Sequence, residues 1–301
     1  MKLAIAGETL GSVKELDEIL KLFKKYGVHA IEIWPENIPV QEGKSLIHKR
    51  LYANRDVERA KEIIAANGME TACVCFGAGF DKELAENTEL FAAELERAVY
   101  VAKELGAKVV NHYCYYVCME EEFPKEKMQA YYGRAIKAAE MCEVTLVLEN
   151  EAHDVTKNPQ SMLKLVKTMN SPVFKTNYDA TNYYQAGFEG FPYEYNLLKE
   201  EIAHVHIKNG CMYHPEHGHC EESLGGHMTG VFKGDAVYYP YAGDGAVNVH
   251  GLIRRIAADG YDGYCSLEPH TVPELCEAYY KAETEYLYET GCFGDYKESD
   301  K

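Results

Sequence analysis

Residues 201–210, EIAHVHIKNG, alternate between polar and apolar side chains. His204, His206 and Lys208 alternate with Val205 and Ile207, so a strand here would place the three polar side chains on one face and the two β-branched ones on the other. A strand that is covered on both faces is normally apolar throughout. The polar face therefore predicts a polar site at the carboxyl end of this strand.

Three further segments, at 144–150, 172–180 and 264–270, show the same kind of alternation. Their polar faces carry Glu149, Asp179 and Glu268, respectively, close to the end of each segment. Carboxylates and imidazoles are typical metal ligands. We therefore expect four strand ends to meet, and we expect the rest of the chain to be the scaffold that brings them together.

The remainder of the chain alternates between short apolar segments and longer segments with helical periodicity. Strands are expected at 2–8, 29–34, 70–77, 108–114, 144–150, 172–180, 202–209 and 264–270. Helices are expected at 14–26, 56–67, 89–105, 126–143, 159–167, 193–200, 249–258 and 273–290. Ser12 and the pair Asn158-Pro159 are typical of helix starts. Glycines that suit helix ends are Gly27, Gly68, Gly106 and Gly260.

Regular strand–helix alternation predicts a parallel sheet, either open or closed. Eight units favour one closed (β/α)8 TIM barrel, of class α/β, spanning residues 1–301. The first strand is not followed by G-x-G-x-x-G, which weakens the dinucleotide-binding alternative. Residues 211–246 interrupt the strand–helix alternation. They form a long insertion after the seventh strand, at the end of the barrel where active sites are built.

Composition narrows the choice of partners. The 301 residues are 47% hydrophobic and 26% charged, with a net charge of −17. Such a charge argues against nucleic acid or an anionic membrane as a partner, and no apolar run is long enough to cross a membrane. The first ten residues are typical of a strand rather than a signal peptide, so we expect a cytoplasmic protein.

The ten cysteines are expected to be free thiols in such a protein. Cys73, Cys75 and Cys265 lie in apolar strand segments, where a thiol behaves as a small hydrophobe. The insertion also contains a run of histidines and cysteines that matches no standard zinc motif. A solvated loop is the default for that run, with a zinc site as the alternative; its residues are Cys211, His214, His217, His219 and Cys220.

Glu149, Asp179, His206 and Glu268 would supply one ligand from each of the last four strands. Three carboxylates and one imidazole suit one divalent metal, Mn²⁺, Mg²⁺, Co²⁺ or Zn²⁺, and give no reason to expect a thiolate ligand. Any one of the four residues could instead be a satisfied strand-end side chain. All four together are better explained by a metal site, since unpaired buried charges are rare.

Several other side chains are candidates for a supporting role. His112 and His153 could face the barrel mouth as a base or a substrate contact, or could be ordinary hydrogen-bonded histidines. Lys208 shares the face of His206 and could polarise a substrate oxygen. His270 could support the metal site. Trp34 could stack on a sugar or pack in the rim.

The sequence resembles the xylose-isomerase-like barrels of the sugar phosphate isomerase/epimerase family. The resemblance rests on LVLEN, the Asp of NYDAT, HVHIKN and the ending AGDGAVNVHGLIRRIAADGYDGYCSLEP. It implies one catalytic divalent metal on Glu149, Asp179, His206 and Glu268, with the two glutamates as acid and base next to a sugar carbonyl. Two departures are Asn209, where the family often has Asp, and Glu151, where many members have His.

The chain also resembles the catalytic subunit of the C-glycoside deglycosidases, which belong to the same family. That resemblance implies a lyase that cleaves 3-oxo-C-glycosides of aromatic aglycones with Mn²⁺ and a small second subunit. The 24 tyrosines and the VYYPY run in the insertion suit an aromatic aglycone, although tyrosines that pack a loop are an equal alternative. Mn²⁺ is therefore the preferred metal, and the expected partners are a small-molecule sugar or glycoside and either a small subunit or further copies of the chain.

Two hypotheses from other classes remain. One is a catalytically silent barrel that binds metal or serves as a partner subunit, and the complete ligand set argues against it. The other is an apurinic endonuclease of the same superfamily. The resemblance implies that such an endonuclease needs three metals, more histidine ligands and a basic face. This chain has one evident set of metal ligands and a net charge of −17.

Overall fold

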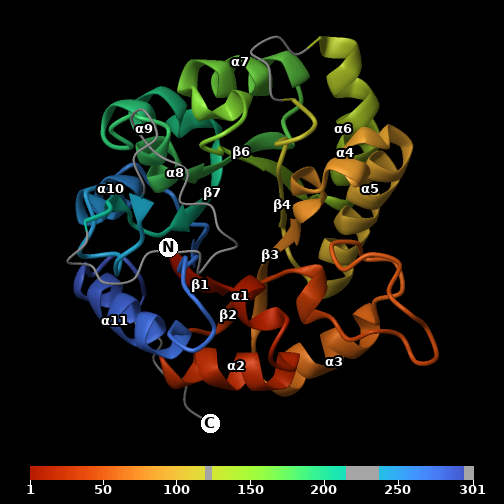
Figure 1. Ribbon diagram of the computed structural model, residues 1–301, viewed down its shortest axis with the longest axis horizontal. Helices are drawn as coiled ribbons and strands as arrows, with labels where there is room; N and C mark the ends of the chain where they lie inside the picture. The colour runs from red at the N-terminus through yellow and green to blue at the C-terminus, as the bar shows by residue number, and fades with distance from the viewer. Residues whose placement is uncertain (119–123, 215–236, 295–301) are drawn as a thin grey trace.

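The chain folds into a closed barrel of eight parallel strands surrounded by helices (Figure 1). The computed structural model describes residues 1–118, 124–214 and 237–294. The barrel strands are β1 (Lys2–Ala6), β2 (Ala30–Ile33), β3 (Glu70–Phe76), β4 (Val109–His112), β5 (Thr145–Glu149), β6 (Phe174–Asp179), β7 (Ile202–Ile207) and β10 (Tyr264–Leu267). Each pairs with its neighbours in the chain, and β10 closes the barrel on β1. The predicted (β/α)8 barrel is confirmed.

The helices surround the strands in Figure 1, most of them in an outer ring. They are α1 (Glu8–Gly11), α2 (Leu16–Lys25), α3 (Val57–Ala66), α4 (Lys82–Glu86), α5 (Thr88–Leu105), α6 (Lys125–Cys142), α7 (Pro159–Met169), α8 (Ala180–Gln185), α9 (Tyr193–Leu198), α10 (Val249–Ala258) and α11 (Cys276–Glu289). Short 3-10 turns occur at Pro35–Asn37, Gly77–Phe80, Val155–Lys157 and Lys199–Glu201. Among the described helices, none is both long and apolar enough to cross a membrane.

Most of the expected helix boundaries are found. Gly27, Gly68, Gly106 and Gly260 have φ between 62° and 87°, a left-handed conformation that glycine adopts without steric cost. Asn158 caps α7 by accepting the backbone N–H of Gln160 and Ser161. Ser12 as the cap of the first long helix is wrong. The short helix α1 ends there, and α2 starts only after Glu15, whose backbone N–H is accepted by Glu18 at 3.2 Å.

The strands have one apolar face and one largely polar face. Their outward side chains pack against the helices in the main hydrophobic core; examples are Ile5, Val74, Leu148, Val205 and Leu267. The bottom of the barrel interior is filled by three small residues, Ala4, Ala30 and Ala72. Above them the interior side chains are polar and buried; they include Glu32, Asn111, Glu149, Asn177, His204, His206 and Ser266. The barrel therefore surrounds a polar centre near its carboxyl end.

Within the insertion, β8 (Cys211–Met212) and β9 (Val237–Tyr238) pair as a small antiparallel sheet. Asn209 fixes its base, because its side-chain amide donates to the carbonyl oxygens of Ala242 and Val247 at 2.8 and 3.0 Å. Asn209, which stands where the family often has Asp, thus has a structural role, because both of these bonds use the N–H groups of its amide. The zinc alternative for residues 211–220 depends on His217, His219 and Cys220, which lie outside the described residues.

Helix α11 contacts the last part of the insertion, near Ala242, through a buried carboxyl group. Glu283 is 1% exposed and accepts the backbone N–H of Ala242 at 3.2 Å. Burial raises the pKa of Glu283 to about 8. The folded chain therefore holds a proton on this carboxyl across a pH range in which the unfolded chain has released it, from about 4.5 to 8.

Glu283→Gln is expected to make the protein more stable at pH 8 and to change it little near pH 4.5. Wild-type stability falls as pH rises through this window, because the unfolded state then binds fewer protons than the folded state. Glutamine cannot ionise, so the gain at pH 8 should be on the order of 4 kcal/mol. Urea unfolding at both pH values measures it, with the exposed Glu285→Gln on the same helix as the control. An equal effect at both pH values would contradict the prediction.

Candidate active site

Four expected ligands converge at the carboxyl end of the barrel. Glu149 ends β5, Asp179 ends β6, His206 lies near the end of β7, and Glu268 follows β10. One ligand atom from each lies within 4.8 Å of the other three. All four side chains are buried. Strand register explains the convergence, because Asp179 lies opposite His206 in the β6–β7 pair and neighbouring strands end at the same level.

His206 lies between carboxylates on both sides of its ring. Its Nδ1 atom is 3.0 Å from Glu149 Oε1 and 3.4 Å from Glu268 Oε2, while its Nε2 atom is 3.0 Å from Glu32. Burial alone would lower the pKa of His206, but the charges of Glu149 and Glu32 outweigh it and hold that pKa well above its usual range. Glu32 thus orients the ring so that Nδ1 faces the four-residue cluster. In metal sites a carboxylate commonly binds the other ring nitrogen of a ligating histidine and orients it in this way.

Lys208 is directed into the cluster itself. Its Nζ atom lies 2.7 Å from Asp179 Oδ2 and 2.6 Å from Glu268 Oε2. Burial would raise the pKa of Glu268, but the positive charges of Lys208 and His206 hold it well below its usual range. In the structure Lys208 therefore neutralises two carboxylates of the cluster, and its contact with a substrate stays a prediction.

Glu149 is held by three side-chain amides. Asn111 and Asn177 donate to its Oε2 atom at 2.7 and 3.1 Å, and Asn182 lies 3.4 Å from its Oε1 atom. Burial raises the pKa of Glu149, and the nearby Glu268 adds to that shift. Asn111 was not among the residues predicted from the sequence. The signal that could have found it is the polar pair Asn111-His112 at the end of an apolar strand, of which only one member can face inward.

His112 is the member of that pair that faces outward, so its expected place at the barrel mouth is wrong. Its ring packs between Tyr132 of α6 and Phe174 of β6, with centroid distances of 5.0 and 5.5 Å. Neither ring nitrogen has a hydrogen-bond partner among the described residues. Burial lowers the pKa of His112 to about 3.

His112→Phe is expected to leave turnover unchanged and to make the protein more resistant to acid. The folded chain keeps this imidazole neutral down to about pH 3, whereas the unfolded chain protonates it near pH 6.5. Wild-type stability is therefore lost as pH falls through that window, and phenylalanine removes this contribution. Unfolding midpoints at pH 7 and pH 5 measure the effect, and the half-exposed His250→Phe is the control. Loss of turnover in His112→Phe would restore the catalytic interpretation.

The other three candidates lie on the rim. Trp34 is 2% exposed and stacks on Tyr113 at a centroid distance of 5.9 Å, so rim packing takes most of its surface and the sugar-stacking alternative is not favoured. His270 Nε2 lies 3.5 Å from Glu268 Oε2, where it can support that carboxylate. His153 lies beside Gln185, with 3.4 Å between His153 Nε2 and Gln185 Nε2, and it is not one of the four clustered residues.

A cleft with a volume of about 350 Å³ opens at the barrel mouth and reaches Glu268. Its polar lining includes Glu8, Glu36, Lys49, Arg50, Glu268 and His270. Burial and the nearby Glu268 raise the pKa of Glu8 to about 7. Glu8 was not predicted from the sequence, because a lone acidic residue after the first strand carries no motif. The cleft therefore reaches the cluster at Glu268.

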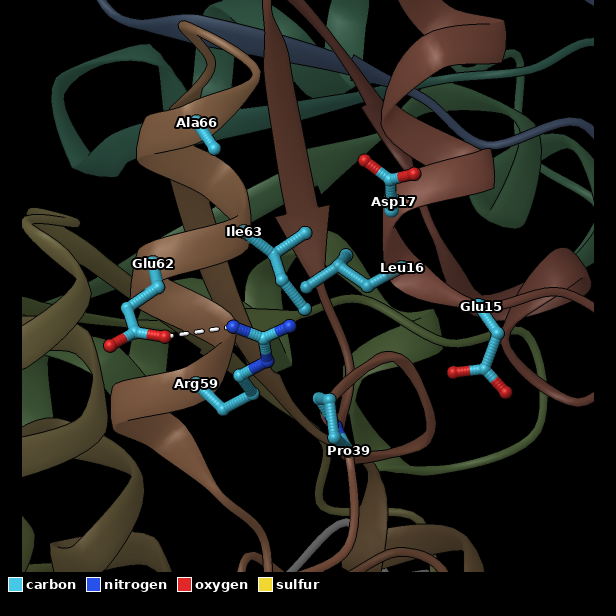
Figure 2. A pocket seen from close by; sticks show the side chains of 8 residues that line it. All are labelled: Glu15, Leu16, Asp17, Pro39, Arg59, Glu62, Ile63 and Ala66. Carbon is cyan, nitrogen blue, oxygen red and sulfur yellow. Dashed lines mark hydrogen bonds and ion pairs between the residues drawn. The ribbon is translucent and has the colours of Figure 1, made fainter.

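A larger hollow of about 570 Å³ lies between α2 and α3 (Figure 2). Its lining residues are Glu15, Leu16, Asp17, Pro39, Arg59, Glu62, Ile63 and Ala66. These residues include no imidazole or thiol, and the Arg59–Glu62 ion pair among them is about 60% exposed. We therefore place the candidate site at the mouth, where buried groups with shifted pKa values converge on a cleft.

The cluster fits a divalent cation. Ligand atoms about 2.0–2.2 Å from one cation are at most about 4.4 Å apart, and the four observed atoms lie within 4.8 Å. Only small side-chain movements would bring them to that distance. Three carboxylate oxygens and one imidazole nitrogen suit Mg²⁺, Mn²⁺, Co²⁺ or Zn²⁺.

The fold is shared with solved structures of low sequence identity. It matches the probable 3-DHS dehydratase AsbF of Bacillus anthracis (TM-score 0.68, 17% identity, covering 96% of this chain and 99% of that one). It also matches a xylose isomerase-like TIM barrel protein from Mycobacterium smegmatis in complex with magnesium (TM-score 0.66, 15% identity, covering 96% of this chain and 97% of that one). An L-ribulose 3-epimerase matches with a TM-score of 0.64 and 15% identity (96% and 94%).

The sequence was also compared with curated proteins and with models of protein families. No curated protein matches the chain. The model of the xylose isomerase-like TIM barrel family matches residues 20–290, which include all four clustered residues and the insertion. The expected family resemblance is confirmed: the chain belongs to the xylose isomerase-like TIM barrel family.

Proposed function

We propose that the chain is a divalent-metal-dependent enzyme that removes a proton from the carbon next to a carbonyl group of a sugar or keto-sugar. The observation that carries the proposal is the convergence of Glu149, Asp179, His206 and Glu268 within 4.8 Å, beside a cleft that Glu268 lines. The epimerase among the structural neighbours supports this reaction class by analogy.

Glu149, Asp179, His206 and Glu268 would hold the cation, with Mn²⁺ as our choice among the hard divalent ions. The cation would supply positive charge to a carbonyl oxygen and a neighbouring hydroxyl group of the substrate, which makes the adjacent proton easier to remove. Lys208 neutralises the carboxylates of Asp179 and Glu268. Glu32 holds the His206 ring in the orientation that binding requires.

Glu149 and Glu268 are the acid and base. A carboxylate within hydrogen-bond reach of the substrate carbon takes the proton, and the other carboxyl group returns one. Return to the same carbon on the opposite face is epimerisation, and return to the neighbouring carbon is isomerisation. Asn111 and Asn177 hold Glu149 in place, so its position does not depend on the substrate.

The mouth cleft would bind a small sugar or glycoside. Its volume of about 350 Å³ is at the lower end of the range for small-molecule sites. Glu8 and Arg50 line it and can bond to substrate hydroxyl groups. The net charge of −17 continues to argue against nucleic acid as the substrate. The complete set of ligands argues against a silent barrel.

A second candidate is a lyase that cleaves a 3-oxo-C-glycoside of an aromatic aglycone with the help of a small subunit. Aromatic rings near the mouth favour it. Phe80 packs on Tyr113 and Tyr115 at centroid distances of 4.4 and 5.8 Å, and Tyr239 packs on His270 at 4.7 Å. Such rings can bind a planar phenolic group. Proton removal next to the 3-oxo group would then be followed by cleavage of the bond to the aglycone, whose carbon takes the bonding electron pair and receives a proton from the other carboxyl group.

Proton removal can be tested directly in D₂O. The Mn²⁺-loaded chain is incubated with a free ketohexose and, in parallel, with a 3-oxo-C-glycoside, each with and without a candidate small subunit. We expect deuterium at the carbon next to the carbonyl. Turnover of the ketohexose by the chain alone would support the epimerase or isomerase, and aglycone release only with the subunit would support the lyase. No deuterium and no product from either substrate would argue against the proposal.

A further inference from the structure

Two thiols of β3 face the barrel interior rather than the surrounding helices. Cys73 and Cys75 are completely buried, and their Sγ atoms lie within 4.8 Å of each other and of a Glu32 carboxylate oxygen. Cys75 Sγ is 2.8 Å from Glu32 Oε1. As expected, both are buried free thiols, and Cys75 packs with Trp34 and Tyr113 in a hydrophobic cluster, but their contact with a charged carboxylate was not expected.

An imidazole lies on the other side of the same carboxylate. His204 Nε2 is 3.0 Å from Glu32 Oε2 and 3.0 Å from Ser266 Oγ. His204 is completely buried, and its Nδ1 atom has no hydrogen-bond partner among the described residues. His204 lies two residues before His206 on β7, which is one repeat of the strand deeper in the barrel than the cluster at the mouth.

Glu32 is thus a buried carboxylate whose described ion pairs involve only the imidazoles of His204 and His206. A buried carboxylate is costly unless a cation or several donors compensate it. Two thiols and one carboxylate whose ligand atoms lie within 4.8 Å of one another are ligand types that zinc sites use.

We propose that Glu32, Cys73 and Cys75 form a second divalent-cation site, suited to Zn²⁺, below the four-residue cluster, with His204 holding the other oxygen of Glu32. His206 lies between the two sites, with Nδ1 towards Glu149 and Nε2 towards Glu32. The second site takes a softer ion than the cluster because its ligands include thiolates, whereas the cluster offers oxygen and nitrogen. Its role is to fix Glu32 and, through it, the His206 ring.

Binding must displace protons. Without a cation, burial keeps both thiols protonated, since it raises the pKa of Cys73 and raises that of Cys75 further. Each S–H bond breaks as a Zn–S bond forms, and the two protons pass to solvent. Affinity should therefore rise steeply with pH.

The test is cation content together with the absorption spectrum of the Co²⁺-loaded full chain. Thiolate ligands give Co²⁺ a charge-transfer band in the near ultraviolet, and oxygen and nitrogen ligands do not. We expect wild-type protein to bind two cations and to show the band. Asp179→Asn should lose one cation and keep the band, whereas Cys73→Ser/Cys75→Ser should lose one cation and the band.

Cys265→Ser is the matched control, because Cys265 is equally buried but packs in the outer hydrophobic core. It should keep both cations and the band. Absence of the band from wild-type Co²⁺ protein would overturn the second site without any variant, so a variant that fails to fold does not weaken the test. The absorption band does not depend on turnover. If the proposed reaction is wrong, the band is still expected, and if the second site does not exist, the proposed activity is still expected.

Discussion

Glu149→Gln is expected to lower kcat by about 10² to 10⁴, the usual contribution of a positioned acid or base. The amide is neutral and cannot accept the substrate proton. It also places an N–H group next to the donors Asn111 and Asn177, which hold Glu149 Oε2 at 2.7 and 3.1 Å. The measurement is turnover together with deuterium exchange of the Mn²⁺-loaded variant. Both should fall together if Glu149 removes or returns the proton.

A matched control separates catalysis from folding. Glu94→Gln removes another buried carboxylate, which is 3% exposed on α5 outside the barrel, and should keep wild-type turnover. Circular dichroism and cation content verify that the Glu149 variant is folded and loaded. Full activity of Glu149→Gln on the true substrate would exclude Glu149 as the acid or base.

Lys208→Met is expected to destabilise the cation-free protein by about 3–5 kcal/mol, the usual effect of removing one partner of a buried ion pair. It would leave the carboxylates of Asp179 and Glu268 without the ammonium group that lies 2.7 and 2.6 Å from them. A divalent cation supplies that charge again, so excess Mn²⁺ should restore most of the lost stability. Urea unfolding in chelator and in Mn²⁺ measures the difference.

The control for this prediction is an exposed ion pair. Lys2 and Glu70 are about 60% exposed and 2.9 Å apart, and exposed pairs contribute at most about 1 kcal/mol. Lys2→Met should therefore have a small effect that Mn²⁺ does not change. If Lys208→Met were equally destabilised in chelator and in Mn²⁺, the cluster would not bind the cation through Asp179 and Glu268.

The interior site contrasts with the usual filling of small barrels. Barrel interiors are commonly packed with branched apolar side chains, whereas Ala4, Ala30 and Ala72, with Tyr264 packed against them, fill the bottom of this one. The polar groups above them are buried and satisfied largely by one another. We therefore expect the site to be rigid before substrate binds, as efficient acid–base catalysis requires.

Much of this protein could be predicted from the order of its residues. Strand and helix periodicity are local properties, so the eight-unit barrel and the glycine-ended helices followed from them. Alternation within 202–209 and 144–150 is sufficient to place His206 and Glu149 on the inner face. Because parallel strands in a closed barrel end at the same level, the meeting of the four ligands was a geometric consequence of the fold.

Only the tertiary structure decided which polar side chains share a partner. Sequence periodicity could not tell whether Asn111 or His112 faces the interior, since adjacent residues of a strand face opposite sides and both of these are polar. The contact of Glu32 with Cys75 joins β2 to β3, and its contact with His204 joins residues 172 positions apart. The second contact forms only because the closed barrel makes β2 and β7, which are not neighbours in the sheet, face each other across its interior.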